Sequence, residues 1–164
     1  MFLKIKFTVF VLILFPFYLS AQVSKGSKSL GLDLIFFGYT QQYENGPLQF
    51  QLSNNVSFDY FPLDNLSVGV ISSIDAVNKS IDWRIGPYGR YFLWQGIYLQ
   101  PTYLYGLTTG DHWAGGDIGY SKLWKSRFAV EPGITYFKVF ARKVDFDRWG
   151  IKLGFKYYFI KSKA

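Results

Sequence analysis

The sequence predicts an all-β fold, an eight-stranded antiparallel up-and-down transmembrane β-barrel. Apolar and polar residues alternate with a period of two in segments separated by short turn signals, whereas helical periodicity is hard to find. Five of these segments are close to the length of about 9 to 11 residues that crosses a bilayer at a tilt. Tight and longer connections also alternate along the chain, which is typical of a barrel inserted from one side.

Residues 1–21 are predicted to be a secretory signal peptide that is cleaved after Ala21. Lys4 and Lys6 precede an uncharged apolar run at 7–19, which is shorter than the roughly 20 residues of a membrane-spanning helix. Cleavage would leave one barrel domain at 22–164. That domain would have 143 of the 164 residues and, without the two lysines, a net charge of +5 instead of +7.

The composition narrows the ways in which this domain can be stabilised and the partners it can bind. It contains no Cys, so disulfides cannot hold it together. No second apolar run is long enough for a helix, so any membrane residence must come from strands. The positive charges are dispersed rather than clustered, and we therefore expect no nucleic-acid partner.

We predict eight strands and seven connections. The strands cover residues 29–40, 47–61, 66–75, 81–93, 97–108, 115–124, 127–140 and 147–160. Tight turns at Asp64-Asn65, Gln95-Gly96 and Lys125-Ser126 alternate with longer loops at 41–46, 76–80, 109–114 and 141–146. In an outer-membrane barrel the tight turns would be periplasmic, and an even number of strands would return both ends of the chain to that side.

Strand parity separates an apolar face from a polar one. In 47–61 the apolar face has Phe50, Leu52, Val56, Phe58 and Tyr60, and in 147–160 it has Trp149, Ile151, Leu153, Phe155, Tyr157 and Phe159. The segments 81–93, 97–108 and 127–140 alternate in the same way. Asn54 interrupts the apolar face and predicts a local bulge, while Pro87, Pro101 and Pro132 predict bulges or shorter strands.

The polar face is predicted to line the lumen, where glycines make room for large charged side chains. Both signs of charge occur there, so neighbouring groups can neutralise one another. We therefore expect a lumen plugged by a charge network rather than an open pore. The network residues are Asp33, Asp59, Asp82, Arg84, Arg90, Asp117, Glu131, Arg148, Lys152 and Lys156.

Aromatic residues gather at the predicted strand ends, as in the two interfacial girdles of membrane barrels. Lys122 and Lys138 share the lipid-facing parity near strand ends, where a long side chain can reach the interface. The predicted girdles contain Tyr60, Tyr91, Trp94, Trp124, Tyr157 and Phe159 at the periplasmic end, and Trp83, Tyr105, Tyr136 and Trp149 at the other.

The sequence offers no convincing active site, and we expect no enzymatic activity, cofactor or metal. His112, the only histidine, stands beside Asp111 in the predicted loop 109–114, where it could act as a general base. A lone loop histidine is more often simply solvated. Trp113 and Phe146, also placed in or near loops, are either recognition residues or the upper edge of the girdle.

Residues 54–69, a strand, an Asp-Asn turn and a second strand, and residues 131–136 resemble recurring units of small bacterial outer-membrane β-barrel proteins. These proteins include the OmpA transmembrane domain and OmpX. The resemblance implies insertion by the barrel assembly machinery, which recognises a C-terminal strand ending in an aromatic residue; Tyr157, Tyr158 and Phe159 fit this signal. It also implies outer-membrane lipid and lipopolysaccharide as surroundings and a monomeric barrel.

The expected function is therefore a structural or interaction role in the cell envelope. Three alternatives stay open: a soluble lipocalin-like barrel that binds an apolar ligand, a lipid-modifying outer-membrane enzyme, and a narrow pore. The enzyme alternative is weakened because no Ser lies within two residues of His112, as the His-x-Ser arrangement of lipid A deacylases requires. The soluble alternative conflicts with the bulky apolar face, the glycines on the polar face and the aromatics at strand ends.

Overall fold

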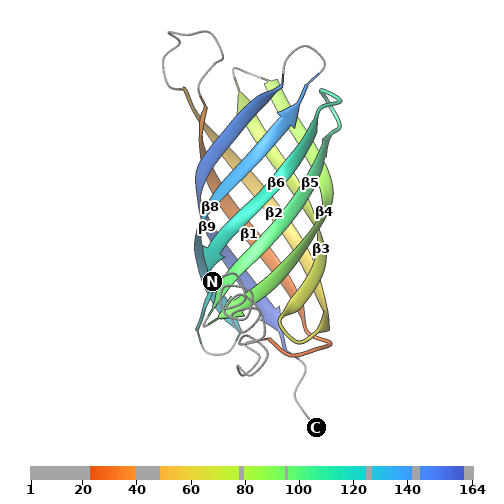
Figure 1. Ribbon diagram of the computed structural model, residues 1–164, viewed down its shortest axis with the longest axis vertical. Coiled ribbons are helices and arrows are strands. Elements are labelled where there is room, and N and C mark those ends of the chain that lie inside the picture. Colours follow the sequence, from red (N-terminus) through yellow and green to blue (C-terminus); the bar gives the residue numbers. More distant parts are fainter. Residues whose placement is uncertain are drawn as a thin grey trace, which may run out of the picture.

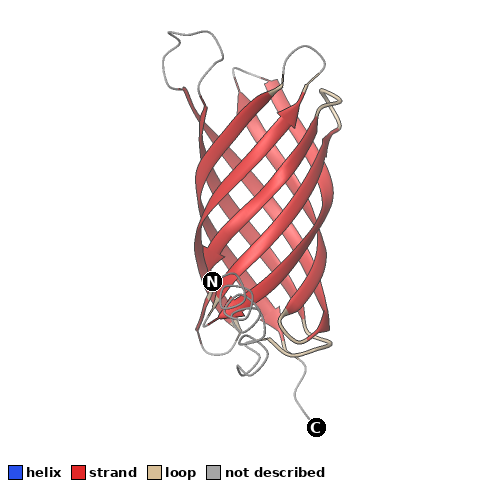
Figure 2. Cartoon of the chain, in the orientation of Figure 1, coloured by secondary structure: helices blue, strands red, loops and turns tan. Residues whose placement is uncertain are grey.

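The computed structural model describes residues 23–39, 49–77, 80–94, 96–124, 127–141 and 145–160. These residues form strands and turns that close into a tilted antiparallel barrel (Figures 1 and 2). Within these ranges no helix is long and apolar enough to cross a membrane. The strands are β1 (Lys28–Tyr39), β2 (Gln49–Leu63), β3 (Leu66–Val77), β4 (Ser80–Trp94), β5 (Ile97–Gly106), β6 (His112–Tyr120), β7 (Lys122–Trp124), β8 (Phe128–Phe140) and β9 (Phe146–Phe159).

The barrel has eight strand positions, because β6 and β7 follow one another along the same neighbour, β8. Strands that are neighbours in the barrel pair antiparallel, and β1 pairs with β9 from Lys28 opposite Phe159 to Gly38 opposite Trp149. This last pairing closes the sheet and removes its free edges. The predicted eight-stranded antiparallel barrel is confirmed, and most of the strand bounds differ from prediction by one to three residues.

The two ends of the barrel differ in their connections, and we name them from these. The turn end contains the start of β1, the end of β9, and the tight turns at Asn65 and Gly96, both of which have positive φ (62° and 95°). The opposite end is the loop end. The predicted signal peptide, the loop 41–46 and the turn Lys125-Ser126 lie outside the described residues.

The prolines do not produce the predicted bulges or shorter strands. Pro87, Pro101 and Pro132 each continue the register with one neighbouring strand, opposite Val70, Gly116 and Leu153 respectively. On the other side the register is unchanged, but the pair at the proline itself is missing. A proline lacks one N–H, so it weakens only one of its two ladders. The break between β6 and β7 lies opposite Pro132 for this reason.

The bulge predicted at Asn54 is absent. Asn54 points outward and is exposed, in continuous register between Leu34 of β1 and Ile74 of β3. Register shifts occur instead close to the turn end, between Tyr60 and Leu63 and between Phe92 and Trp94. The extra residue is therefore absorbed beside the tight turns, where strands leave the barrel wall.

The loop predicted at 109–114 is shorter than expected. Gly106 N–H donates to the carbonyl of Asp111 and Gly110 N–H to that of Gly106, both at 2.8 Å, and Gly110 has a φ of 73°. This compact connection lets β6 begin at His112. His112 and Trp113 are therefore strand residues, and Phe146, also assigned near a loop, is the first residue of β9.

Glycine permits close strand contact at one instructive position in β4. An added Cβ at Gly86 would collide with the backbone carbonyl of Tyr103, whereas one at Gly89 would meet the carbonyl of Ser67 at an ordinary 3.8 Å. The contact at Gly86 is with backbone, which cannot move away by changing a side-chain rotamer. Gly86 is thus required by the spacing of β4 and β5, and Gly89 is not.

We predict that Gly86→Ala lowers the free energy of unfolding by about 1–3 kcal/mol, because the new methyl group forces the two strands apart. Gly89→Ala, the matched control on the same strand, should change it by no more than about 0.5 kcal/mol. Urea unfolding of the folded barrel in lipid bicelles would measure both. Equal effects of the two substitutions would contradict the close approach at Gly86.

Candidate functional site

The interior of the barrel is the candidate site, because it gathers most of the polar and charged side chains of the strands. Of the sequence-predicted network, Arg90 and Glu131 are among the most deeply buried, while Asp82 and Arg148, at the loop end, remain partly accessible. The buried members are Asp33, Asp59, Arg84, Arg90, Asp117, Glu131, Lys152 and Lys156. The structure thus places all ten on the inner side of the wall and brings them together in two groups.

Arg90 is the centre of the first group. Its Nη1 donates to both carboxylate oxygens of Glu131, at 2.9 and 2.8 Å, and its Nε donates to Oε1 of Gln100 at 2.8 Å. The hydroxyl of Tyr158 donates to Glu131 Oε1 at 3.0 Å. Four strands therefore meet at one ion pair. Such a buried pair is costly to break from one side, since the remaining charge has no water to solvate it.

Two lysines of β9 extend this group. Lys156 Nζ is 2.5 Å from Asp59 Oδ2, and Asp59 also accepts hydrogen bonds from the hydroxyls of Ser29, Ser67 and Tyr88. The positive charge of Lys156 is thus held by a carboxylate that is itself fixed by donors from three strands, β1, β3 and β4.

Lys152 also points inward from β9, four residues before Lys156. It pairs with Asp117 of β6, and its Nζ is 3.9 Å from Asp33 of β1. Gln100 Nε2 donates to the same Asp117 at 3.0 Å, which links Lys152 back to Arg90. The charges are therefore connected across the bore rather than only along its wall.

The second group lies at the loop end around Asp75, a residue that the sequence analysis missed. Arg84 pairs with Asp75, and Arg148 Nη1 is 3.7 Å from it. Gln51 joins the two sides, donating to Asp75 at 2.6 Å and accepting from Arg148 at 2.7 Å. Asp75 shares the inward parity of Gly69 and Ser73, which could have revealed it, but it falls at the last residue of the predicted strand.

Aromatic side chains with inward parity form two apolar layers that the sequence analysis also missed. One, towards the turn end, contains Val23, Phe61, Phe92, Tyr98, Ala129 and Tyr158. The other contains Ile35, Phe37, Ile71, Tyr88, Leu104, Trp113, Phe137 and Val139. Trp113 is 2% exposed and lies beneath the guanidinium carbons of Arg84 and Arg148, 3.8 and 4.7 Å from its ring centroid, so it is neither a surface recognition residue nor part of a girdle.

Phe146 packs, partly buried, against the second layer. The residues of the predicted girdles all lie on the outer face instead. Tyr91 is half-buried, and the others are exposed: Tyr60, Trp94, Trp124, Tyr157 and Phe159 towards the turn end, and Trp83, Tyr105, Tyr136 and Trp149 towards the loop end.

His112 also points outward. Its Nδ1 is hydrogen-bonded to the hydroxyl of Tyr103, and its ring centroid is 5.2 Å from that of Tyr105. Among the described residues no group of three or more His, Cys, Asp and Glu side chains could hold a metal ion. The imidazole is thus engaged with two tyrosines on the outer face, away from the charged interior.

We predict that Arg90→Ala costs about 3–5 kcal/mol of stability, because Glu131 is left buried without its partner. The pair Arg90→Met with Glu131→Leu should recover most of this loss, since it removes both charges together. Lys138→Ala is the control: Lys138 and Asp147 are 4.0 Å apart and about half exposed, so its effect should stay below about 1 kcal/mol. Urea unfolding would test the series, and an Arg90→Ala effect as small as the control would contradict the network.

No protein-family model and no curated protein sequence matches the chain. Solved structures do match it in fold. Neisserial surface protein A aligns with a TM-score of 0.58 and 13% identity, over 81% of this chain and 99% of that one. The N-terminal β-barrel domain of Pseudomonas aeruginosa OprF aligns with a TM-score of 0.50 and 13% identity, over 82% and 100%. The chain therefore has the fold of a small bacterial surface barrel, in agreement with the resemblance found in its sequence.

Proposed function

We propose that this protein is an outer-membrane β-barrel with a plugged lumen, serving as a structural or interaction component of the cell envelope. The observation that carries the proposal is the polarity of the wall. Large apolar side chains such as Leu32, Ile134 and Ile151 are about 60% exposed on the outside, while Arg90, Glu131 and Lys152 are almost fully buried inside. Lipid outside and a polar interior inside require this arrangement.

The same observation argues against a soluble lipocalin-like barrel. That alternative needs an apolar cavity inside the barrel and a polar surface outside it. Here exposed apolar side chains cover the outer face of the strands around the barrel. The apolar patches on a soluble monomer usually cover no more than a few hundred Å². Exposed tyrosines and tryptophans near both ends of the wall further support residence in a bilayer.

The plugged lumen is supported by the two apolar layers and by the ion pairs. An eight-stranded barrel has a bore only wide enough for side chains to fill it. Arg90, Lys152 and Lys156 are each paired with a carboxylate of a non-adjacent strand, so they are not available to line a path for ions. Val23, which precedes β1, adds to the layer at the turn end, where it is 1% exposed.

The proposed role is non-enzymatic, and the surroundings of His112 support this. Its hydrogen-bond partner is Tyr103 rather than a serine, so His112 does not form the His–Ser pair that a lipid A deacylase would use. Assembly would use β9, which ends at Phe159 and pairs with β1 to close the barrel. We propose that the barrel assembly machinery performs this closure, following cleavage of residues 1–21, and that the protein is monomeric among lipid and lipopolysaccharide.

We predict that Leu153→Asp prevents accumulation of the barrel in the outer-membrane fraction, because a charge in the middle of β9 would face hydrocarbon. Trp149→Asp, nearer the loop end, should have the same effect to a lesser degree. Leu153→Ala, which shortens the side chain but keeps it apolar, is the matched control and should insert normally. The measurement is gel mobility of the membrane fraction with and without boiling, since a folded barrel shifts on heating.

Wild-type protein in the soluble periplasmic fraction, with no heat-dependent shift, would overturn the membrane assignment and favour the lipocalin-like alternative. Normal insertion of both aspartate variants would show that the outer face does not meet lipid.

We predict that the wild-type barrel produces no regular single-channel steps in planar lipid bilayers, because the paired charges and apolar layers leave no continuous aqueous path. Regular steps whose ion selectivity changes in Glu131→Gln would instead support the narrow-pore alternative. The variant matters because Glu131 is fully buried at the centre of the bore, so any ion path must pass it.

A further inference from the structure

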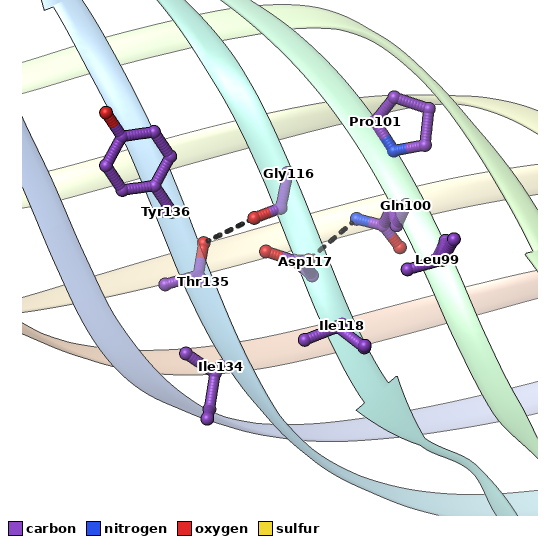
Figure 3. Close-up of a pocket in the computed structure, with 9 residues that line it drawn as sticks. All are labelled: Leu99, Gln100, Pro101, Gly116, Asp117, Ile118, Ile134, Thr135 and Tyr136. Atoms are coloured by element: carbon purple, nitrogen blue, oxygen red, sulfur yellow. Dashed lines mark hydrogen bonds between the residues drawn. The ribbon is translucent and has the colours of Figure 1, made fainter.

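A groove runs over the outer face where β5, β6 and β8 lie side by side (Figure 3). It has a volume of about 500 Å³, and its outward lining is Leu99, Pro101, Gly116, Ile118, Ile134 and Tyr136. Polar side chains beneath its floor are turned inward and occupied: Gln100 donates to Asp117 at 3.0 Å, and Thr135 donates to the carbonyl of Gly116 at 3.5 Å. The surface left to an occupant is therefore almost entirely apolar.

The groove exists because of Gly116. This residue lies opposite Pro101 on β5 and Tyr136 on β8, and no side chain covers the backbone between them. A Cβ at Gly116 would collide with the carbonyl of Gln100, so the close approach of β5 excludes every larger residue. The depression is fixed by the backbone, and it does not depend on which rotamers its walls adopt.

The chemistry of the groove changes along its length. Ala114 lies two residues from Gly116 along β6, towards the loop end, between Tyr103 of β5 and Lys138 of β8. The Tyr103 hydroxyl is hydrogen-bonded to His112. Lys138 follows Tyr136 by two residues on the same face of β8, a rise of about 7 Å. In the loop-end half of the described strands, Lys138 is the only lysine or arginine on the outer face.

Lys138 is accessible to a ligand. Its side chain is 48% exposed, and its contact with Asp147 is a long one, 4.0 Å between two half-exposed groups. Such a pair contributes little, so an incoming anion can replace the carboxylate at small cost. The outer face thus presents an apolar groove with a cation just beyond its loop-end edge, which is complementary to an amphiphile with a negative headgroup.

We propose that this groove is a binding site for a phosphate-bearing anionic lipid, with one acyl chain lying over Gly116 and the phosphate beside Lys138. The inference rests on the proposed membrane location, because only there does the outer face meet lipid. A second barrel would also bury the apolar walls, but its outward carboxylate at the matching depth, Asp147, already lies 4.0 Å from its own Lys138. The gradient from apolar to cationic favours lipid.

The test uses the full-length barrel, refolded in detergent with either phosphatidylglycerol or phosphatidylcholine carrying identical acyl chains, and native mass spectrometry to count the lipids retained. We expect wild type to retain phosphatidylglycerol preferentially. Ile118→Trp should fill the groove and abolish this retention, whereas Ile74→Trp should preserve it. Both isoleucines point outward and are about equally exposed, at 51% and 46%, but Ile74 lies on β3, outside the groove.

Lys138→Gln should reduce the preference for phosphatidylglycerol by up to about fivefold, the range of an exposed ion pair. Lys122→Gln, which removes one of the outward lysines at the other end of the barrel, should leave the preference unchanged. Equal retention by Ile118→Trp and Ile74→Trp would overturn the site. A dimer peak present in wild type and lost only in Ile118→Trp would overturn it in favour of a second copy.

Failure of this inference and failure of the proposed function have different signatures. Every variant is first assayed for the heat-dependent mobility shift of the outer-membrane fraction. A wild-type protein that does not insert refutes both proposals. A protein that inserts normally but retains no lipid in the groove refutes only the lipid site.

Discussion

The constraint on which the structure depends is that the backbone polar groups of the wall must find their hydrogen-bond partners within the protein, as the proposed membrane location requires. A sheet meets this requirement only if it closes, and pairing of β1 with β9 is the closing step. Closure explains how the prolines are tolerated. Each of them gives up the pairs at the proline and at the residue before it on one side, while the other neighbour keeps the register, so the wall stays continuous through Pro87, Pro101 and Pro132.

Closure with eight strand positions also determines the interior. The bore is narrow, so large inward side chains fit only where neighbours are small or where two of them share space by pairing. Gly31 and Gly154 illustrate this, since an added Cβ would contact the side chains of Lys156 and Asp33 respectively. The apolar layers lie on either side of the central charges and keep water away from them. Low local polarity strengthens each ion pair, but it also makes each one costly to leave incomplete.

Parity was enough to predict the strands, the closed barrel and the inner or outer side of most residues. It could not distinguish roles among aromatic residues, because a tyrosine suits both an interfacial girdle and an apolar interior layer. Tyr157 and Tyr158 are neighbours, but Tyr157 points outward and is 39% exposed, whereas Tyr158 points inward and is 0% exposed. Asp75 and Trp113 were missed or misplaced because both lie at predicted strand ends, where a shift of one or two residues moves a side chain between wall and loop. Nothing in the structure explains why a polar residue, Asn54, occupies an exposed outward position.

The plugged lumen that we propose restricts where this protein can bind other molecules. Carboxylates, guanidiniums and ammonium groups that would attract ligands in a cleft are here engaged with one another, and the charge at the centre is nearly balanced between Asp33, Asp59, Asp117 and Glu131 on one side and Arg90, Lys152 and Lys156 on the other. Binding must therefore use the loops or the outer face. At the proposed membrane location, a uniformly apolar outer face would contact lipid chains without selecting among them. Only departures from uniformity, such as the bare backbone at Gly116 and the cation at Lys138, would select one lipid from many.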